Sequence, residues 1–506
     1  MQFIKNHKLL LLFSIIYFIS RFTNLTILPI FNDEAIYLDW GHKSLHLPNN
    51  LFFSLYDAKQ PLLIWLFGIV QEIISDPLVA GRGVSIAAGF LTLVGLYTLG
   101  KKLFSISVGY IAVFCYIINP FFLFFDRQAL MESTIACIGV WACYFFLHLQ
   151  KTQQSKWSIL LGTVLGIGFL VKGSSIIFIM TILVISLSLL FYKKKNLKGN
   201  GKNIFLIFIF VFGINTILFS QKIFWQTLYT NNRFSFTLQE LLNFPILQWI
   251  KNLREVGEIA FWHLTPVVFF LTCFGIVLFL FNKKSNERVI VSLFVVTILF
   301  VVLLTRNIMP RYVVSFFPLV CLFSASALHF LWKKYTSVSV ALGFLAFVSC
   351  LFLSVQLAFS PYGYFLSLEK VTAFSQKEEY VTMWPSGYGV VNSVTTIKML
   401  AKDEKIYVGV RPDAGNPESA MFAYFNGSKL VQPTYINSTI IHPWADYNNN
   451  CIRMRTAFYF VSRENETAGL DMFFEKEIET FYKPEKKSYI KLYKIKTCPE
   501  KISFQY

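Results

Sequence analysis

Long apolar runs separated by short polar breaks fill roughly the first 360 residues of the chain. A membrane-spanning helix needs about 20 predominantly apolar residues. By this length the sequence predicts about eleven spans, at residues 8–29, 79–100, 104–124, 131–150, 157–171, 174–192, 203–220, 264–282, 289–305, 312–332 and 335–357. The fifth and sixth share one run, too long for a single span, that Lys172 and Gly173 interrupt. We interpret this interruption as a tight hairpin.

The apolar segment 61–74 is too short to be counted as a span. Its length suits an interfacial or re-entrant helix, and counting it as a span would move every later connection to the other side. We therefore expect two large outer loops, at residues 30–78, with interfacial helices, and at residues 221–263.

Lysine-rich connections all fall on one side of the membrane if the eleven spans alternate. These clusters contain Lys5, Lys8, Lys101, Lys102, Lys151, Lys156, Lys193, Lys194, Lys195, Lys198, Lys202, Lys283, Lys284, Arg288, Lys333 and Lys334. Cytoplasmic connections of membrane proteins are enriched in Lys and Arg. The pattern therefore predicts a cytoplasmic amino terminus and an extracytoplasmic carboxyl terminus.

The pattern changes after residue 358, where short apolar stretches alternate with polar turns. Residues 405–410 and 456–462 are typical of strands, 393–405 of a helix, and 491–496 of an edge strand. We predict a transmembrane domain at residues 1–358 and a small extracytoplasmic α/β domain at residues 359–506.

Composition agrees with a polytopic α-helical membrane protein. The 506 residues are 55% hydrophobic and 15% charged, with a mean hydropathy of +0.54. The net charge of +18 does not indicate nucleic-acid binding, because the cations lie at the ends of apolar runs. Cysteines show no metal-binding spacing, and nothing in the sequence decides whether Cys451 and Cys498 form a disulfide in the tail.

Ionisable residues gather on the predicted outer side. Asp33 and Glu34 directly follow the first span, where acidic groups beside a membrane helix point to a site; the alternative is a solvated helix start with acids near its N-terminus. Five outer connections supply such groups: Asp33, Glu34, Asp57, Lys59, Asp126, Arg127, Glu132, Lys172, His263, Arg306, Arg311 and Tyr312.

These residue types suit two kinds of chemistry. A carboxylate can act as a general base toward an attacking hydroxyl or amine. Cations can bind a phosphate and stabilise it as a leaving group. The structural alternatives are that Arg127 and Lys172 snorkel to the interface and that His263, beside Trp262, anchors a helix there.

The acidic pair resembles the first-loop motif of GT-C membrane glycosyltransferases, closest to the dolichyl-phosphate-mannose protein mannosyltransferase and aminoarabinose transferase group. AKQPLLIWL (58–66) departs from that group's pattern at Gln60, and the hairpin has Ser174 where Pro is usual. The other similar segments are 81–104, DRQALMES (126–133), 160–178, PRYVVSFFPLV (310–320) and WPSGYGV (384–390). The order and spacing of these motifs carry the resemblance, over the first 330 residues and the start of the tail.

The resemblance implies an inverting transfer of a sugar from a polyprenyl- or dolichyl-phosphate donor on the outer face of a membrane, expected to be a prokaryotic plasma membrane. Asp33 takes the role of general base, supported by Glu34 and Glu132. Candidates for the donor phosphate are Lys59, Arg127, Lys172 and Arg311, and further candidates are Asp57, Asp126 and Tyr312. The expected partners are this donor, the bilayer and a protein, lipid or glycan acceptor, without nucleic acid.

Metal dependence stays open at this point. Some relatives of this kind use a divalent cation and others do not, and the sequence shows no His or Cys ligand set. We therefore assign no metal residues and expect no other cofactor.

Two alternative functions stay open. One is another lipid-phosphate enzyme, such as an O-antigen-type ligase, although the chemistry of ligases usually centres on a large late loop. The other is a transporter or flippase of lipid-linked saccharides. Transporters place charges near the midplane and often show internal repeats, whereas here the charges lie at one face and no repeat is found.

Overall fold

The computed structural model describes residues 8–193, 197–230, 233–281, 285–372, 374, 376–402, 405–412, 415–435, 457–464, 467 and 474–495. The chain forms two compact units, which we call the helical unit and the mixed unit. The helical unit comprises Met1–Leu25, Leu51–Ile64 and Arg82–Ser360, and the mixed unit Thr26–Asn50, Trp65–Gly81 and Pro361–Tyr506. Cys451 and Cys498 lie outside the described residues, and the domain boundary at residue 358 stays a prediction.

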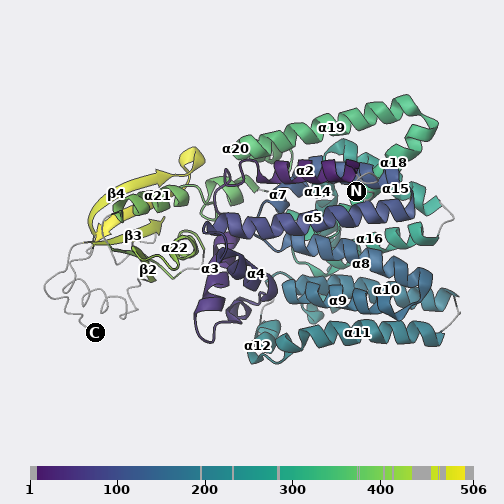
Figure 1. Cartoon of the computed structure of the whole chain (residues 1–506), viewed down its shortest axis with the longest axis horizontal. Coiled ribbons are helices and arrows are strands. Elements are labelled where there is room, and N and C mark those ends of the chain that lie inside the picture. The colour runs from purple at the N-terminus through teal and green to yellow at the C-terminus, as the bar shows by residue number, and fades with distance from the viewer. Residues whose placement is uncertain are drawn as a thin grey trace. The chain divides into compact units, whose positions relative to one another are not determined.

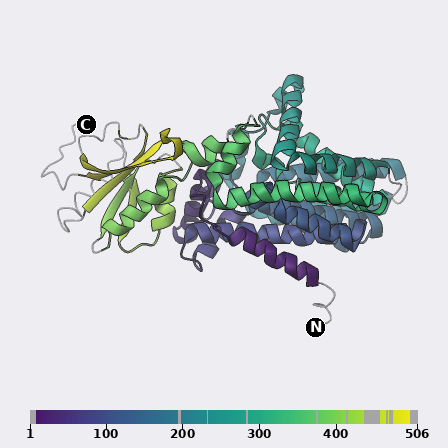
Figure 2. The same cartoon turned by 90° about the horizontal axis from the view of Figure 1, so that it is seen from above.

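The helical unit is a bundle (Figures 1 and 2). Its described elements are α2 (Lys8–Phe22), η1 (Phe53–Asp57), α6 (Ile106–Ile118), α7 (Pro120–Asp126), α8 (Glu132–Thr152), α9 (Ser155–Val171), η2 (Gly173–Ser175), α10 (Ile176–Lys193), α11 (Leu197–Phe219), α12 (Lys222–Thr230), α13 (Leu238–Leu242), α14 (Ile246–His263), α15 (Pro266–Phe281), α16 (Ser285–Leu304), α17 (Pro310–Val313), α18 (Pro318–Lys334) and α19 (Thr336–Phe359). Two more helices, α4 (Leu62–Gln71) and α5 (Pro77–Leu103), belong partly to each unit.

Helix α9 packs between α8 and α11. The approach to α11 is close, because a Cβ placed on Gly162 would lie 2.6 Å from the carbonyl oxygen of Ile207. Small residues at such crossings let membrane helices come into backbone contact.

Five helices within the described residues are long and apolar enough to cross a membrane, or up to seven if each bent pair counts as one span. One pair, α6 and α7, bends by 68° at Asn119 and Pro120. Pro120 starts α7, and the Asn119 side chain accepts a hydrogen bond from the Phe121 amide, so the break has a local cause. The predicted total of eleven spans stays a prediction.

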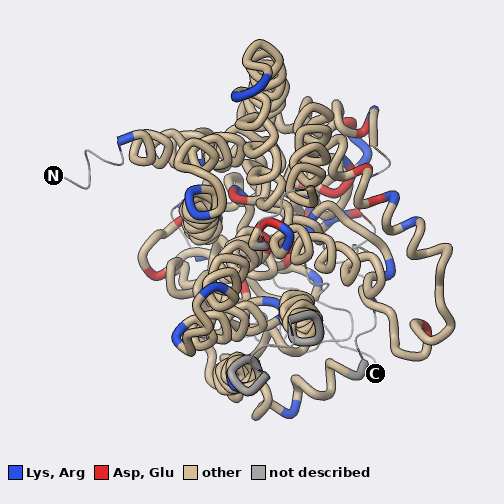
Figure 3. The backbone as a smooth tube through the Cα atoms, turned by 90° about the vertical axis from the view of Figure 1, so that its right-hand side faces the viewer, with Lys and Arg blue, Asp and Glu red and all other residues tan. Residues whose placement is uncertain are grey.

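Within the helical unit, the end of α5, the end of α8 and the start of α9 converge. The Lys102 amine contacts a ring nitrogen of His148. The centroid of that ring lies 4.2 Å from the centroid of the Trp157 ring. Figure 3 shows blue Lys and Arg segments on several helix ends of the chain. Two predicted cytoplasmic connections, after α5 and between α8 and α9, therefore share one end of the bundle, while the orientation in a membrane stays a prediction.

The mixed unit contains a five-stranded sheet of order β2-β1-β3-β5-β4, in which β1 is parallel to β2 and β3 and the other pairs are antiparallel. Its described elements are α3 (Asn32–His46), α20 (Pro361–Glu369), η3 (Glu378–Thr382), α21 (Val390–Leu400), β1 (Ile406–Val410), α22 (Glu418–Phe425), β2 (Val431–Tyr435), β3 (Ala457–Arg463), β4 (Phe474–Tyr482), η5 (Pro484–Lys486) and β5 (Tyr489–Ile495). The strands predicted at residues 405–410 and 456–462 are confirmed as β1 and β3.

The prediction that residues 491–496 form an edge strand is wrong, because β5 lies between β3 and β4. Its lysines suggested an edge that faces water. Instead they pair with glutamates of β4: Lys491 lies 2.8 Å from Glu477, and Lys494 lies 3.0 Å from Glu475. Cross-strand ion pairs thus accommodate these charges inside the sheet.

Candidate functional site

Glu132 and Lys172 form an ion pair in the helical unit, with 2.8 Å between the Glu132 Oε1 and Lys172 Nζ atoms. Glu132 is the first residue of α8 and Lys172 follows the last residue of α9, so each charge is favourable for its helix dipole. Glu132 is 5% exposed, whereas the Lys172 side chain keeps 26% of its surface accessible. The pair therefore lies at the start of α8 and the end of α9, away from the connection between these helices that Lys151 and Lys156 flank.

The segment that precedes α4 joins this place. The Gln60 Oε1 atom accepts a hydrogen bond of 2.7 Å from the Gly173 amide, directly beside Lys172. The departure from the expected Pro at position 60 therefore has a structural use, because the Gln60 carboxamide holds the hairpin. Nearby in sequence, Asp57 lies 3.3 Å from Arg233, and the Lys59 amine lies 5.4 Å from the centre of the Phe234 ring.

Asp126 is the centre of a buried network in the helical unit. Its carboxylate, 1% exposed, accepts hydrogen bonds from four side chains: Tyr17, Arg21, Tyr116 and Ser133. Arg21 is fully buried, and its guanidinium also donates to the carbonyl oxygens of residues 116 and 117. Such a fully bonded carboxylate joins α2, α6, α7 and α8, and its interactions are those of a structural anchor.

The neighbouring residue, Arg127, is bonded differently. Its Nη2 atom donates to the carbonyl oxygens of Thr23 and Asn24 at 3.0 and 2.6 Å. Its Nε atom is buried without a hydrogen-bond partner among the described residues. A buried unpaired donor costs about 1–3 kcal/mol, so it calls for an explanation such as a ligand or a water.

The last two predicted residues of the helical unit lie in the short helix α17. Arg311 and Tyr312 are both half-buried. The Arg311 Nη2 atom lies 3.9 Å from the Met309 sulfur, and the Tyr312 amide donates to the Met309 carbonyl. Their part in a phosphate site stays a prediction.

The acidic pair opens α3 in the mixed unit. Asp33 is half-buried, whereas Glu34 is fully buried and its Oε2 atom accepts a hydrogen bond of 2.9 Å from the Phe31 amide. A Glu that reaches back to the N-cap amide stabilises the first turn of a helix. Glu34 therefore fixes the position at which Asp33 enters the helix.

Two segments of the tail form hydrogen bonds with the residue just before Asp33. The Asn32 amide donates to the Pro385 carbonyl at 3.0 Å, and the Asn32 side chain accepts from the Asn416 amide at 2.8 Å. A Cβ on Gly387 would lie 2.2 Å from the Ile30 carbonyl oxygen, so only glycine allows this approach. WPSGYGV (384–390), singled out for its resemblance, thus positions the acidic pair.

A second buried acid of α3 was not among the predicted site residues. Asp39 is 1% exposed and lies 2.6 Å from the Lys43 amine, which also donates to the Tyr435 hydroxyl at 3.0 Å. Burial raises the pKa of Asp39, and the Lys43 charge partly offsets that effect. The spacing of four residues was the available signal, since it places both side chains on one helix face.

The comparisons with known proteins agree with this architecture. Residues 58–220 match the family model of dolichyl-phosphate-mannose-protein mannosyltransferases. The resemblance to GT-C membrane glycosyltransferases is confirmed. No curated protein sequence matches the chain.

Among solved structures, the chain is similar to ArnT from Cupriavidus metallidurans bound to undecaprenyl phosphate, with a TM-score of 0.54 and 10% identity over 96% of this chain and 98% of that one. The apo state of the same ArnT gives a TM-score of 0.56 at 10% identity, over 96% and 97%. AglB, an oligosaccharyltransferase from Archaeoglobus fulgidus in complex with an inhibitory peptide and a dolichol-phosphate, gives 0.50 at 14% identity, over 90% and 69%. The chain therefore shares the fold of these structures.

Proposed function

We propose that this chain transfers a sugar from a polyprenyl-phosphate donor to an acceptor on the outer face of the membrane. The observation that carries the proposal is the fold shared with ArnT over 96% of the chain, since that ArnT structure is bound to undecaprenyl phosphate. The match to the mannosyltransferase family model supports it, because residues 58–220 include five of the candidate site residues: Lys59, Asp126, Arg127, Glu132 and Lys172.

In the proposed reaction, Asp33 takes a proton from the hydroxyl or amine of the acceptor. The freed nucleophile attacks the anomeric carbon of the sugar from the face opposite the phosphate. The bond between that carbon and the phosphate oxygen breaks, the polyprenyl phosphate leaves with the electron pair, and the configuration at the carbon is inverted. A half-buried carboxylate held at a fixed helix start suits a general base.

The donor phosphate has two candidate ligands with supporting geometry. Lys172 keeps part of its surface exposed although it is paired with Glu132, so a phosphate oxygen can compete for its amine. The unpaired Nε atom of Arg127 offers a buried donor. Cations of this kind bind phosphate and stabilise the charge of a leaving group. Lys59 and Arg311 remain further candidates in this proposal.

The test measures transfer of radiolabelled sugar from polyprenyl-phosphate donors in membranes that carry wild type, Asp33→Asn or Asp76→Asn. Asp76 is a matched control, because its Oδ1 atom accepts a hydrogen bond from the Val79 amide and Asn preserves that oxygen. Loss of a general base is expected to reduce transfer by about 10²–10⁴-fold. Equal transfer by all three proteins would remove Asp33 from the chemistry, and no transfer from any donor would favour the transporter alternative.

A further inference from the structure

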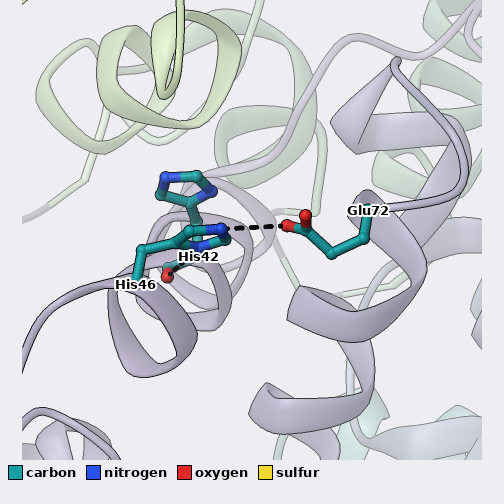
Figure 4. A group of neighbouring side chains, drawn as sticks. All are labelled: His42, His46 and Glu72. Carbon is teal, nitrogen blue, oxygen red and sulfur yellow. Dashed lines mark hydrogen bonds and ion pairs between the residues drawn. The ribbon is translucent and has the colours of Figure 1, made fainter.

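Two histidines of α3 and a glutamate that directly follows α4 converge, and none of the three is among the residues assigned to sugar transfer. Within the part of the chain that the structure describes, the His42, His46 and Glu72 ligand atoms form one group in which all lie within 4.8 Å of one another. We infer that these three side chains form a binding site for a divalent transition-metal ion, with Zn²⁺ as the best-suited metal. Figure 4 shows the three side chains facing a common point between α3 and the end of α4.

The spacing of the two histidines produces this arrangement. His42 and His46 are four residues apart on α3, so they project from the same face on successive turns. Their rings are nearly parallel, with centroids 4.0 Å apart. Neutral imidazole is a preferred ligand of Zn²⁺, and carboxylates commonly complete such sites.

The position of His46 already has the features of a metal ligand. Its Nδ1 atom lies 3.0 Å from the His42 carbonyl oxygen. A hydrogen bond from Nδ1–H to that oxygen favours the tautomer in which Nε2 carries a lone pair for a metal ion. The Nε2 atom lies 3.4 Å from the Glu72 Oε1 atom. Ligands about 2.0–2.1 Å from a tetrahedral zinc are separated by roughly 3.4 Å, so this pair needs little movement to bind one ion.

The two helices that carry the ligands are firmly joined. The Gln71 side chain, directly before Glu72, donates to the Leu38 carbonyl of α3 at 3.1 Å. A Cβ on Gly68 would lie 2.4 Å from the Gly41 carbonyl oxygen, so α3 and α4 cross in backbone contact next to His42. The ligand positions are therefore preorganised by the backbone, although the side chains are accessible.

An ion pair alone is the competing explanation. An ion pair would explain why His46 lies near Glu72, but it would not explain why His42 lies there too. If both stacked histidines were protonated, their charges would repel each other. Exposure of 41% for the His46 and 53% for the Glu72 side chain leaves room for a water as the fourth ligand. We therefore expect a solvent-accessible site that ties the end of α3 to the end of α4.

The experiment uses the full chain, purified in detergent without a polyhistidine tag and stripped with a chelator. Bound metal is measured by elemental analysis after equilibration with Zn²⁺, and ligand geometry by the visible absorption of the Co²⁺ form. Wild type and the control His329→Gln, which removes a histidine from α18, should each bind one ion per chain. Zn²⁺ should raise the melting temperature of both proteins.

The variant His46→Gln should bind Zn²⁺ at least about 100-fold more weakly, because loss of an outer-shell partner alone costs about 10–100-fold. Its melting temperature without metal serves as the check on folding, and Zn²⁺ should no longer raise it. Stoichiometric binding that persists in the triple variant His42→Gln, His46→Gln, Glu72→Gln would overturn the inference. Absence of stoichiometric binding by wild type would leave only the ion pair and would also overturn it.

Discussion

Gly387 is the position where a single methyl group is expected to move the acidic pair. The residue lies in the tail segment that packs on the chain before Asp33. A Cβ there would meet three backbone atoms of Ile30, at 2.2 Å from its oxygen, 2.7 Å from its nitrogen and 2.8 Å from its carbonyl carbon. Backbone atoms cannot turn aside as a side chain can, so the whole segment that leads into α3 must shift.

The size of the shift follows from the contact distances. Non-bonded carbon atoms are most stable about 3.5–4.0 Å apart, so Gly387→Ala must separate the two segments by about 1 Å. Overpacking of this kind typically costs about 1–3 kcal/mol. A displacement of about 1 Å in a reacting group can cost about 100-fold in rate. We therefore expect Gly387→Ala to reduce sugar transfer by about 100-fold while the protein still folds.

The assay compares transfer rates and thermal unfolding for wild type, Gly387→Ala and Gly213→Ala. Gly213 in α11 is a matched control, because a Cβ there would meet no atom of the described residues within 4 Å. This control should keep its transfer rate. Transfer by Gly387→Ala within twofold of wild type, in a protein that remains folded, would refute the idea that the 384–390 segment positions Asp33.

Two further predictions concern ion pairs. Glu132→Gln or Lys172→Gln alone should lower the free energy of unfolding by about 1–3 kcal/mol, because each leaves a partly buried group without its partner. The double variant should recover part of that loss in a double-mutant cycle. Strictly additive losses would contradict the pairing. In the mixed unit, Lys377, 2.8 Å away, lowers the pKa of Glu485 to about 2, with further contributions from Lys487 and Tyr362. The ionised Glu485 therefore stabilises the fold fully above the ordinary pKa of 4.5, and this contribution is lost as the pH falls through about 2. Glu485→Gln should be less stable than wild type at pH 6 and as stable as wild type below about pH 2. Unfolding measured as a function of pH checks both outcomes.

The sequence was sufficient to predict the helical class and the strands of the tail, because both depend on local apolar patterns. Strands β1 and β3 were predicted from short runs of aromatic and β-branched residues. The position of β5 was not predictable in the same way. Its lysines resemble those of an edge strand, and only the pairing with Glu475 and Glu477 across the sheet explains them.

The site residues also divide into those that a local pattern indicates and those that depend on contacts between distant segments. The charges at Glu132 and Lys172 were identified from their places at span ends, and the structure brings them together across 40 positions. The network around Asp126 was not foreseen, since its partners Tyr17 and Arg21 come from a helix more than 100 residues away. Distant polar contacts of this kind leave no periodic signal, because each one depends on how the helices pack.

The degree of burial separates the predicted residues that can contact a substrate from those that stabilise the fold. Glu34 and Asp126 are almost wholly buried, and each carboxylate is engaged with donors of its own unit. Asp33 and Lys172 both retain accessible surface. A substrate can approach groups of the second kind at their accessible surface, whereas contact with groups of the first kind would break buried hydrogen bonds, which are costly to leave unmade. Substitution of Glu34 or Asp126 should therefore appear first in unfolding measurements, whereas substitution of Asp33 or Lys172 should appear first in sugar transfer.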